Sequence, residues 1–248
     1  MRTTIFDFTN ENYVVTGSSS GIGRQVTLEL AQAGATVLSI GRNKERLAEV
    51  AEHNPNKIIT RSLDVCNSEM LQSAIADFVK EYGKLSGGVH CAGIVAFTPL
   101  RLYDTNTAEQ MMKTNVFAGV ELLRLITKKK YGKSSTSTVM LSSVSAYFAN
   151  KGLLWYSASK AALDNAVRTC AKEICDTKHR VNSVVAGYLD SPMTKETASF
   201  NDMDYIKKRH LLDIGNIIDV TGMVLFLLSE RADWITGSNI VVDGGFLA

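Results

Sequence analysis

Short runs of β-branched and other apolar residues alternate along this chain with longer amphipathic segments. Seven of these runs have the length and the turn-forming neighbours of β-strands: Tyr13–Val15, Thr36–Ile40, Lys57–Leu63, Gly88–Cys91, Thr138–Leu141, Arg180–Val185 and Asn239–Val242. Most of the intervening segments carry the periodicity of helices with one apolar face. This alternation predicts βαβ units with right-handed crossovers, and hence a parallel sheet of about seven strands with helices on both faces.

Composition adds that the chain forms one domain that binds a small molecule. The 248 residues include three prolines, and no low-complexity segment or internal repeat marks a linker, so we expect a single domain over residues 1–248. A net charge of +2 creates no field that would attract nucleic acid. The N-terminal residues lack the apolar stretch of a signal peptide, and the run Met223–Leu228 is too short to span a membrane. We therefore expect a cytoplasmic protein with no nucleic-acid or membrane partner.

Two further features favour ordinary structural roles. The four cysteines have no CxxC spacing and no histidines at metal-ligand spacing, so we expect reduced, buried thiols and no metal site. The cationic run Lys128–Lys133 resembles a nucleic-acid patch, but lysines beside a glycine are also favoured at the C-terminus of a helix, and we prefer that interpretation.

A glycine-rich turn follows the first predicted strand and opens a helix. Gly17 permits a tight turn, Gly21 lets the backbone approach a phosphate, and Gly23 allows the helix to pack closely on the strand. Backbone amides and the helix dipole hold a pyrophosphate in such a turn, although a plain loop with a helix cap has the same composition. We predict a Rossmann-type, doubly wound fold whose dinucleotide site includes Thr16, Gly17, Ser18, Ser19, Ser20, Gly21, Ile22 and Gly23.

The end of the second strand indicates which dinucleotide binds. An acidic residue there would accept a hydrogen bond from the ribose 2′-hydroxyl of NAD(H), whereas this chain has Gly41 followed by Arg42. A planar guanidinium suits a 2′-phosphate, so Arg42 predicts a preference for NADP(H) over NAD(H). The alternative is that Arg42 is a solvated loop charge.

A tyrosine and a lysine share one face of a later predicted helix. Tyr156 and Lys160 are separated by four residues, which brings their side chains together. A phenol with a pKa of about 10 is a weak acid or base at neutral pH, but a neighbouring ammonium and an oxidised nicotinamide both lower that pKa. Tyr156 is therefore a candidate general acid or base.

These motifs together resemble the short-chain dehydrogenase/reductase family, and the chain is similar to the 3-oxoacyl-[acyl-carrier-protein] reductases of its compact single-domain branch. The glycine turn, Asn115, Ser143, Tyr156 and Lys160 occur in the family's order, and the resemblance spans almost the whole chain. It implies that Tyr156 exchanges a proton with the substrate oxygen, that Ser143 hydrogen-bonds this oxygen, and that hydride passes between the nicotinamide and the carbonyl carbon. Lys160 is then implied to contact the nicotinamide ribose, and Asn115 to support a proton relay. Ser142 is an alternative to Ser143.

The resemblance also implies further cofactor contacts. They are Asp64, Val65, Ala92, Gly93, Gly187, Leu189 and Ser191. Helix capping by Asp64 or Asn67 is the alternative at the first of these positions. Two departures from the family pattern are His90–Cys91, for which a structural histidine is the preferred interpretation, and Ala186, which replaces a proline that rigidifies the turn.

The family pattern further implies a substrate lid near residues 188–213, although Phe200, Met203 and Tyr205 within it also suit ordinary packing. The segment Ile240–Phe246 resembles a subunit contact, which implies a homo-oligomer, either a tetramer or a dimer.

The function predicted on these grounds is an NADP(H)-dependent oxidoreductase that interconverts a ketone and a secondary alcohol, acting as a carbonyl reductase on a 3-oxoacyl or other small ketone. A nicotinamide-binding regulatory or structural subunit is the alternative from another class, which retention of the catalytic residues argues against. A nucleotide-sugar epimerase or dehydratase ranks lower, because such relatives carry an added substrate domain.

Overall fold

The computed structural model of the protein describes residues 6–197 and 202–248. Within these residues seven parallel strands form one sheet in the order β3-β2-β1-β4-β5-β6-β7. The strands are β1 Asn12–Thr16, β2 Thr36–Gly41, β3 Ile58–Ser62, β4 Leu85–His90, β5 Gly132–Ser143, β6 Arg180–Ala186 and β7 Asn239–Val242. The predicted fold class and all seven predicted strands are therefore confirmed. The chain order reverses between β1 and β4, which makes the crevice at their carboxyl ends the expected place for a ligand.

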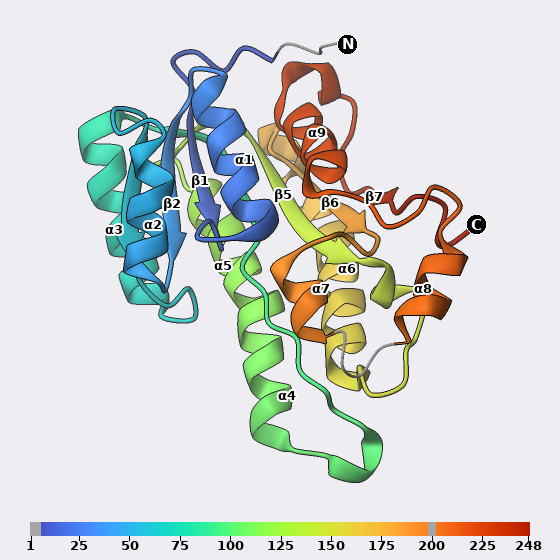
Figure 1. Cartoon of the computed structure of the whole chain (residues 1–248). Helices are drawn as coiled ribbons and strands as arrows, with labels where there is room; N and C mark the ends of the chain where they lie inside the picture. Colours follow the sequence, from blue (N-terminus) through green and yellow to red (C-terminus); the bar gives the residue numbers. More distant parts are fainter. Residues whose placement is uncertain (1–5, 198–201) are drawn as a thin grey trace.

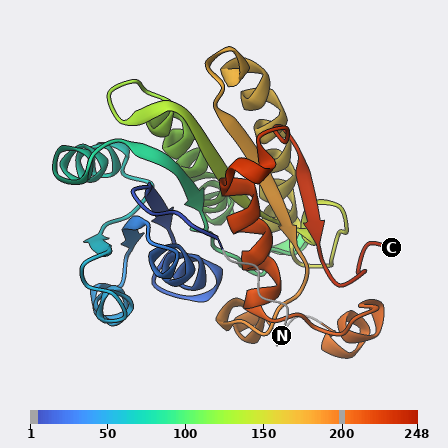
Figure 2. The same ribbon diagram turned by 90° about the horizontal axis from the view of Figure 1, so that it is seen from above.

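Nine helices pack around this sheet in the described part of the chain. They are α1 Gly21–Gln32, α2 Lys44–Glu52, α3 Ser68–Tyr82, α4 Thr105–Met112, α5 Ala118–Ile126, α6 Leu154–Ile174, α7 Pro192–Thr197, α8 Met203–Arg209 and α9 Ile217–Leu228. Helices α1, α2 and α9 cover one face of the sheet, and α3, α5 and α6 cover the other, as Figures 1 and 2 show. Helix α4 projects beyond the carboxyl end of the sheet (Figure 1).

The two faces of the sheet are buried because its central strands are apolar on both sides. Val15 of β1 packs with Val26 and Leu30 of α1 on one face. Val14 packs with Leu71 and Ile75 of α3 on the other. Each pair of helical residues is four apart, so it lies on one stripe of its helix. This alternation of the side chains of β1 requires a helix layer on both faces.

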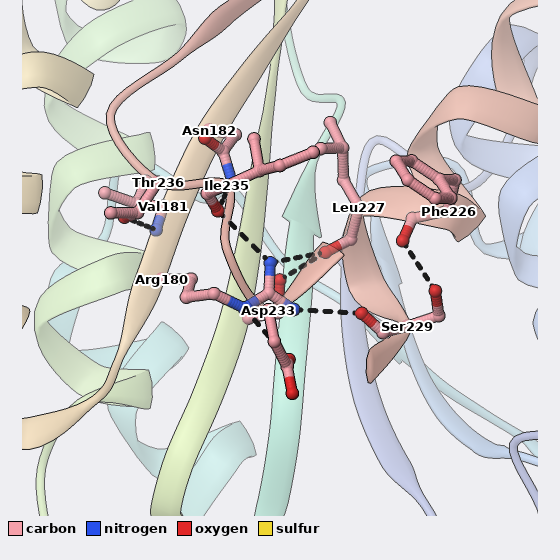
Figure 3. A network of polar contacts seen from close by, with 10 residues as sticks. Arg180, Val181, Asn182, Phe226, Leu227, Ser229, Asp233, Ile235 and Thr236 are labelled. Atoms are coloured by element: carbon pink, nitrogen blue, oxygen red, sulfur yellow. Dashed lines mark hydrogen bonds and ion pairs between the residues drawn. The ribbon is translucent and has the colours of Figure 1, made fainter. Parts of the chain in front are cut away.

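Arg180, at the start of β6, connects the C-terminal part of the chain to the sheet through hydrogen bonds and an ion pair (Figure 3). Its guanidinium donates hydrogen bonds to the carbonyls of Leu227 (2.9 Å), Ser229 (3.1 Å) and Ile235 (3.4 Å). Its Nε lies 3.5 Å from the Asp233 carboxylate, which is largely exposed. Arg180 therefore ties the end of α9 and the approach to β7 onto β6.

The prediction that the four cysteines are buried was wrong. Cys66 and Cys175 are exposed, and Cys91 and Cys170 are half-buried, so none is fully buried. Among the described residues, no three His, Cys, Asp or Glu side chains are grouped so that they could hold a metal ion. No helix in these ranges is long and apolar enough to cross a membrane.

Candidate active site

A cavity of about 540 Å³ opens at the carboxyl end of the sheet. Its lining comes from the segments that follow β1, β2, β3, β4 and β6, from the end of β5 and from the start of α6. Most of the predicted site residues line it: Gly17, Ser19, Ser20, Gly21, Ile22, Gly23, Arg42, Asp64, Val65, Ala92, Gly93, Ser143, Tyr156, Lys160, Gly187, Leu189 and Ser191. Three do not, namely Thr16, Ser18 and Asn115, which are fully buried beside the cavity.

The glycine turn packs closely on the chain below it and is open towards the cavity. Gly17 has a φ of 69°, and a β-carbon there would lie 2.6 Å from the Ala92 nitrogen. Gly21 also has a positive φ, but a β-carbon at this position would have no protein atom within 4 Å. The turn therefore leaves space for a ligand at the N-terminus of α1, where backbone amides favour a phosphate.

The side chain of Ser18 does not face this space. Its hydroxyl lies 2.7 Å from the Ser39 hydroxyl and donates to the Ile40 carbonyl at 3.0 Å. Ser18 thus joins the turn to β2 and has no donor left for a phosphate, whereas Ser19 and Ser20 line the cavity.

Two arginines border the cavity where β2 ends. Arg42 follows the strand directly, and Arg46 lies in the first turn of α2, four residues later. Asn43 caps this helix by accepting a hydrogen bond from the Arg46 amide at 2.7 Å. Arg24 points elsewhere, because its guanidinium donates to Nε2 of His53 at 3.1 Å. Asp64 borders the same end of the cavity. The cap of α3 is Asn67 and not Asp64, because the side chain of Asn67 accepts the hydrogen bond from the Met70 amide.

Tyr156 lies near the start of α6 with only 8% of its surface exposed. Burial raises the pKa of its phenol, and a hydrogen bond with Ser143 acts in the opposite direction. The Ser143 hydroxyl also accepts the Ser145 amide at 3.2 Å, which fixes its position. Ser142, by contrast, has a buried hydroxyl without a hydrogen-bond partner among the described residues. Of the two serines, Ser143 is therefore the one that interacts with Tyr156 in the cavity.

Lys160 lies one helical turn after Tyr156 and on the same face of α6. Its ammonium donates to the Leu141 carbonyl at 2.8 Å and lies 5.7 Å from the centroid of the Tyr156 ring. Burial lowers the pKa of Lys160 to about 8, while the carboxylate of Asp164, one more turn along α6, raises it. The expected lowering of the Tyr156 pKa by Lys160 is not seen in the chain alone, because burial dominates the shift and the ammonium is turned towards Leu141.

Asn115 lies in a π-helical segment, Lys113–Phe117, between α4 and α5. Its side chain accepts the Ile94 amide (2.8 Å) and donates to the Ile94 carbonyl (3.0 Å) and to the Ser159 hydroxyl (2.9 Å). Ser159 in turn donates to the Tyr156 carbonyl at 2.7 Å. Asn115 therefore joins the loop after β4 to the helix that carries Tyr156.

His90 has a structural position at the end of β4. It is 1% exposed, with Nδ1 at 2.9 Å from the Thr16 hydroxyl and Nε2 at 3.1 Å from the Thr114 carbonyl. A carbonyl can only accept, so Nε2 carries the proton and Nδ1 accepts from Thr16. Burial lowers the pKa of His90 to about 3, and the Lys160 charge adds to this effect. His90 is therefore neutral at ordinary pH.

Comparison with known proteins identifies the family. A family model described as enoyl-(acyl carrier protein) reductase matches residues 17–247. A 3-oxoacyl-[acyl-carrier-protein] reductase of Aquifex aeolicus is 32% identical, over 94% of this chain and 95% of the relative. The chain belongs to the short-chain dehydrogenase/reductase family. Its relatives in this family include an L-xylulose reductase of Caenorhabditis elegans, 30% identical over 97% of both chains.

A solved structure agrees with this assignment. A short-chain dehydrogenase/reductase described as glucose/ribitol dehydrogenase, from Brucella melitensis, superposes with a TM-score of 0.91 at 26% identity, over 98% of this chain and 99% of that one. Membership of the short-chain dehydrogenase/reductase family makes the chain an oxidoreductase of CH–OH and C=O groups that uses a nicotinamide cofactor.

Several cavity residues of this short-chain dehydrogenase/reductase were missed in the sequence. Arg46 could have been found, because it follows Arg42 at a helical spacing of four residues. Ser145 and Leu153 gave no signal, since only the meeting of the loops after β5 and β6 places them in the cavity. Tyr188 fell within the predicted lid near 188–213 but was not singled out.

Proposed function

We propose that this chain reduces ketones with NADPH and that Tyr156 is the proton donor. The observation that carries the proposal is that one cavity contains both the buried Tyr156–Ser143 pair and a glycine turn bordered by Arg42. The names of the relatives support it, because 3-oxoacyl-[acyl-carrier-protein] and L-xylulose reductases act on carbonyl groups.

The residues of the glycine turn suit a dinucleotide phosphate. The open space at Gly21 would receive the pyrophosphate, and the amides of Ser19 and Ser20 would bind it. Arg42 and Arg46 together would bind the 2′-phosphate, which is the basis for the proposed preference for NADP(H). Asp64, Val65, Ala92 and Gly93 would border the adenine and ribose, and Gly187, Leu189 and Ser191 the nicotinamide. When bound, the nicotinamide supplies the hydride.

Side chains of the protein would supply the proton that the substrate oxygen takes up. The Tyr156 phenol would donate to the substrate oxygen while the Ser143 hydroxyl holds this oxygen in place. Lys160 has ammonium protons besides the one bound by Leu141, and these would reach the ribose hydroxyls. Asn115 would act by holding the loop after β4 and Ser159, as its hydrogen bonds indicate.

The surroundings of the cavity support a lid and an oligomer as parts of the same proposal. Residues of α7 line the cavity mouth, within the predicted lid near 188–213; its residues 198–201, including Phe200, lie outside the described ranges. Strand β7 is an edge of the sheet, with Val241 47% exposed, and suits the proposed homo-oligomeric contact, in a tetramer or a dimer. A cytoplasmic location would provide NADPH.

The first test compares wild type with Tyr156→Phe. We expect a loss of ketone reduction of at least about 100-fold, because general acid catalysis contributes roughly that much. NADPH affinity, measured by fluorescence, should stay within a few-fold. The matched control is Tyr147→Phe, which removes the hydroxyl of an exposed tyrosine outside the cavity. Undiminished turnover by Tyr156→Phe would refute the proposed chemistry.

The cofactor preference has its own test. Arg42→Asp should reverse the ratio of NADPH to NADH affinity, because a carboxylate repels the 2′-phosphate and accepts from a 2′-hydroxyl. Unchanged relative affinities would contradict the role given to Arg42.

A further inference from the structure

Tyr188 is a cavity residue whose position is fixed from three sides. It follows Gly187 after β6 and borders the same cavity as Tyr156. Its ring packs against Phe246 and His210, with centroid distances of 5.6 and 6.0 Å. Its backbone amide donates to Nε2 of His210 at 3.3 Å. Packing and hydrogen bonding thus hold the ring in one place, so its hydroxyl has a defined position.

The Tyr188 hydroxyl accepts a hydrogen bond and keeps its own proton. The side-chain amide of Asn150, in the loop between β5 and α6, donates to this oxygen at 2.6 Å. Within residues 6–197 and 202–248, no group accepts the Tyr188 proton. Burial raises the pKa of Tyr188 to about 12, with a smaller contribution from Tyr156, so the phenol stays protonated at neutral pH. This half-buried residue of the cavity lining therefore has a hydroxyl proton to donate to a ligand.

Such a donor discriminates between ligands. Polar groups in a mostly apolar pocket fix the orientation of a ligand, and a buried donor left without an acceptor costs free energy. Ser143 and Tyr156 are already committed to the reacting oxygen in the proposed function. Tyr188 is thus a cavity hydroxyl that the proposed reaction does not use, and it needs a different acceptor.

We propose that Tyr188 donates a hydrogen bond to a second oxygen of the substrate, and that Asn150 is the positioning residue that directs this donor. The substrate class is then a ketone with an acceptor oxygen near the reacting carbonyl. An α-hydroxyketone and a 3-oxo ester or thioester both provide such an oxygen. This inference rests on the proposed ketone reduction.

The test uses two pairs of ketones of matched size with NADPH. Hydroxyacetone is compared with butanone, which lacks the hydroxyl, and ethyl 3-oxobutanoate with 2-heptanone, which has the same chain length but lacks the ester oxygens. The wild type should prefer the oxygenated member of at least one pair, and that pair identifies the source of the oxygen. In Tyr188→Phe the ratio of kcat/KM within the pair should fall about 3- to 10-fold, the usual effect of one neutral hydrogen bond. Tyr147→Phe is the matched control, because its hydroxyl also accepts an asparagine amide, from Asn239 at 3.1 Å, but lies outside the cavity.

Asn150→Asp tests the direction of the hydrogen bond. A carboxylate can only accept, so it would take the Tyr188 proton away from the substrate. The same fall in the ratio is expected, although the phenol is still present, and the double variant with Tyr188→Phe should lose nothing further. A common effect of the new charge on both ketones cancels in the ratio. Unchanged melting temperatures establish that the variants are folded.

The outcomes separate the two proposals. If the wild type reduces none of the four ketones, the proposed function fails, and the inference about Tyr188 fails with it. If the wild type reduces them without preference, or if Tyr188→Phe keeps the wild-type ratio, only the role of Tyr188 is overturned. If Asn150→Asp keeps the ratio, Asn150 does not direct the donor.

Discussion

The closest packing in the glycine turn lies between Gly23 of α1 and Gly17. A β-carbon at Gly23 would lie 2.7 Å from the Gly17 carbonyl carbon and would collide with its carbonyl oxygen. These are backbone atoms, so no side-chain rotation relieves the contact. Gly17 cannot withdraw either, because it rests against the Ala92 amide. The variant Gly23→Ala must therefore displace either the turn or the start of α1.

The expected magnitude follows from this collision. Overpacking in a close-packed interior costs about 1–3 kcal/mol. For a chain of this size each kcal/mol lowers the melting temperature by about 2–4 °C, so we expect a decrease of roughly 2–12 °C. In the proposed function the turn binds the cofactor phosphates through hydrogen bonds that each contribute about 1.5–3 kcal/mol. A displaced turn would lose some of these bonds, so NADPH should bind at least about 10-fold more weakly.

Thermal unfolding and fluorescence titration with NADPH measure the two effects. The control is Gly222→Ala in α9, where a β-carbon would have no atom within 4 Å. In a helix this change should stabilise the protein by about 0.5–1 kcal/mol and leave NADPH affinity unchanged. If Gly23→Ala melts and binds NADPH like the wild type, the close packing of the turn and its role in phosphate binding are both refuted.

Two other predictions concern stability. His90 is held neutral with a pKa of about 3, below its ordinary value of 6.5, so the unfolded chain binds the extra proton and stability is lost as the pH falls from about 6.5 towards 3. About 2 kcal/mol should be lost by pH 5, and chemical denaturation of His90→Asn across this range should lack that slope; an identical slope would contradict a neutral His90. Arg180→Met should lower stability by about 1–3 kcal/mol per orphaned carbonyl, measured by urea unfolding, while NADPH affinity is retained. A loss of affinity without a loss of stability would show that Arg180 serves the site rather than the sheet.

The strands were predictable because both faces of a parallel sheet are buried. Runs such as Thr36–Ile40 are mostly apolar, with Val37, Leu38 and Ile40 buried, and the structure extends this strand by one residue only. Strand β5 was predicted from Thr138 but begins at Gly132, because the polar residues after Gly132 continue the strand across an irregularity in its pairing with β4. A polar run in a strand is ambiguous in sequence, since only the pairing with a neighbour shows that it is extended.

The location of the site was predictable, but its chemistry was only partly so. A glycine turn between a strand and a helix depends only on residues that are neighbours in the sequence. The same holds for Tyr156 and Lys160, which share a helix face because they are four positions apart. The pKa of Tyr156 depends on burial by segments far away in the chain, and the sequence contains no measure of that burial. The orientation of Ser18 depends on Ser39 of the neighbouring strand, which is equally invisible in a motif.

A chain of hydrogen bonds connects the segment next to the glycine turn with the helix that carries Tyr156. The Ala92 amide, after β4, donates to the Thr16 hydroxyl, which donates to His90, and His90 donates to the carbonyl of Thr114. Thr114 precedes Asn115 in the π-helical segment, and Asn115 continues through Ser159 to the carbonyl of Tyr156. π-helical segments often occur at functional sites. In this one the carbonyl of Thr114 accepts from His90 of β4, and the side chain of the next residue, Asn115, donates to Ser159 of α6. Because Thr16, His90, Asn115 and Ser159 are buried and each is hydrogen-bonded to the next segment, a displacement at the glycine turn is resisted at Tyr156 as well. In the proposed function this couples the placement of the cofactor to the position of the proton donor.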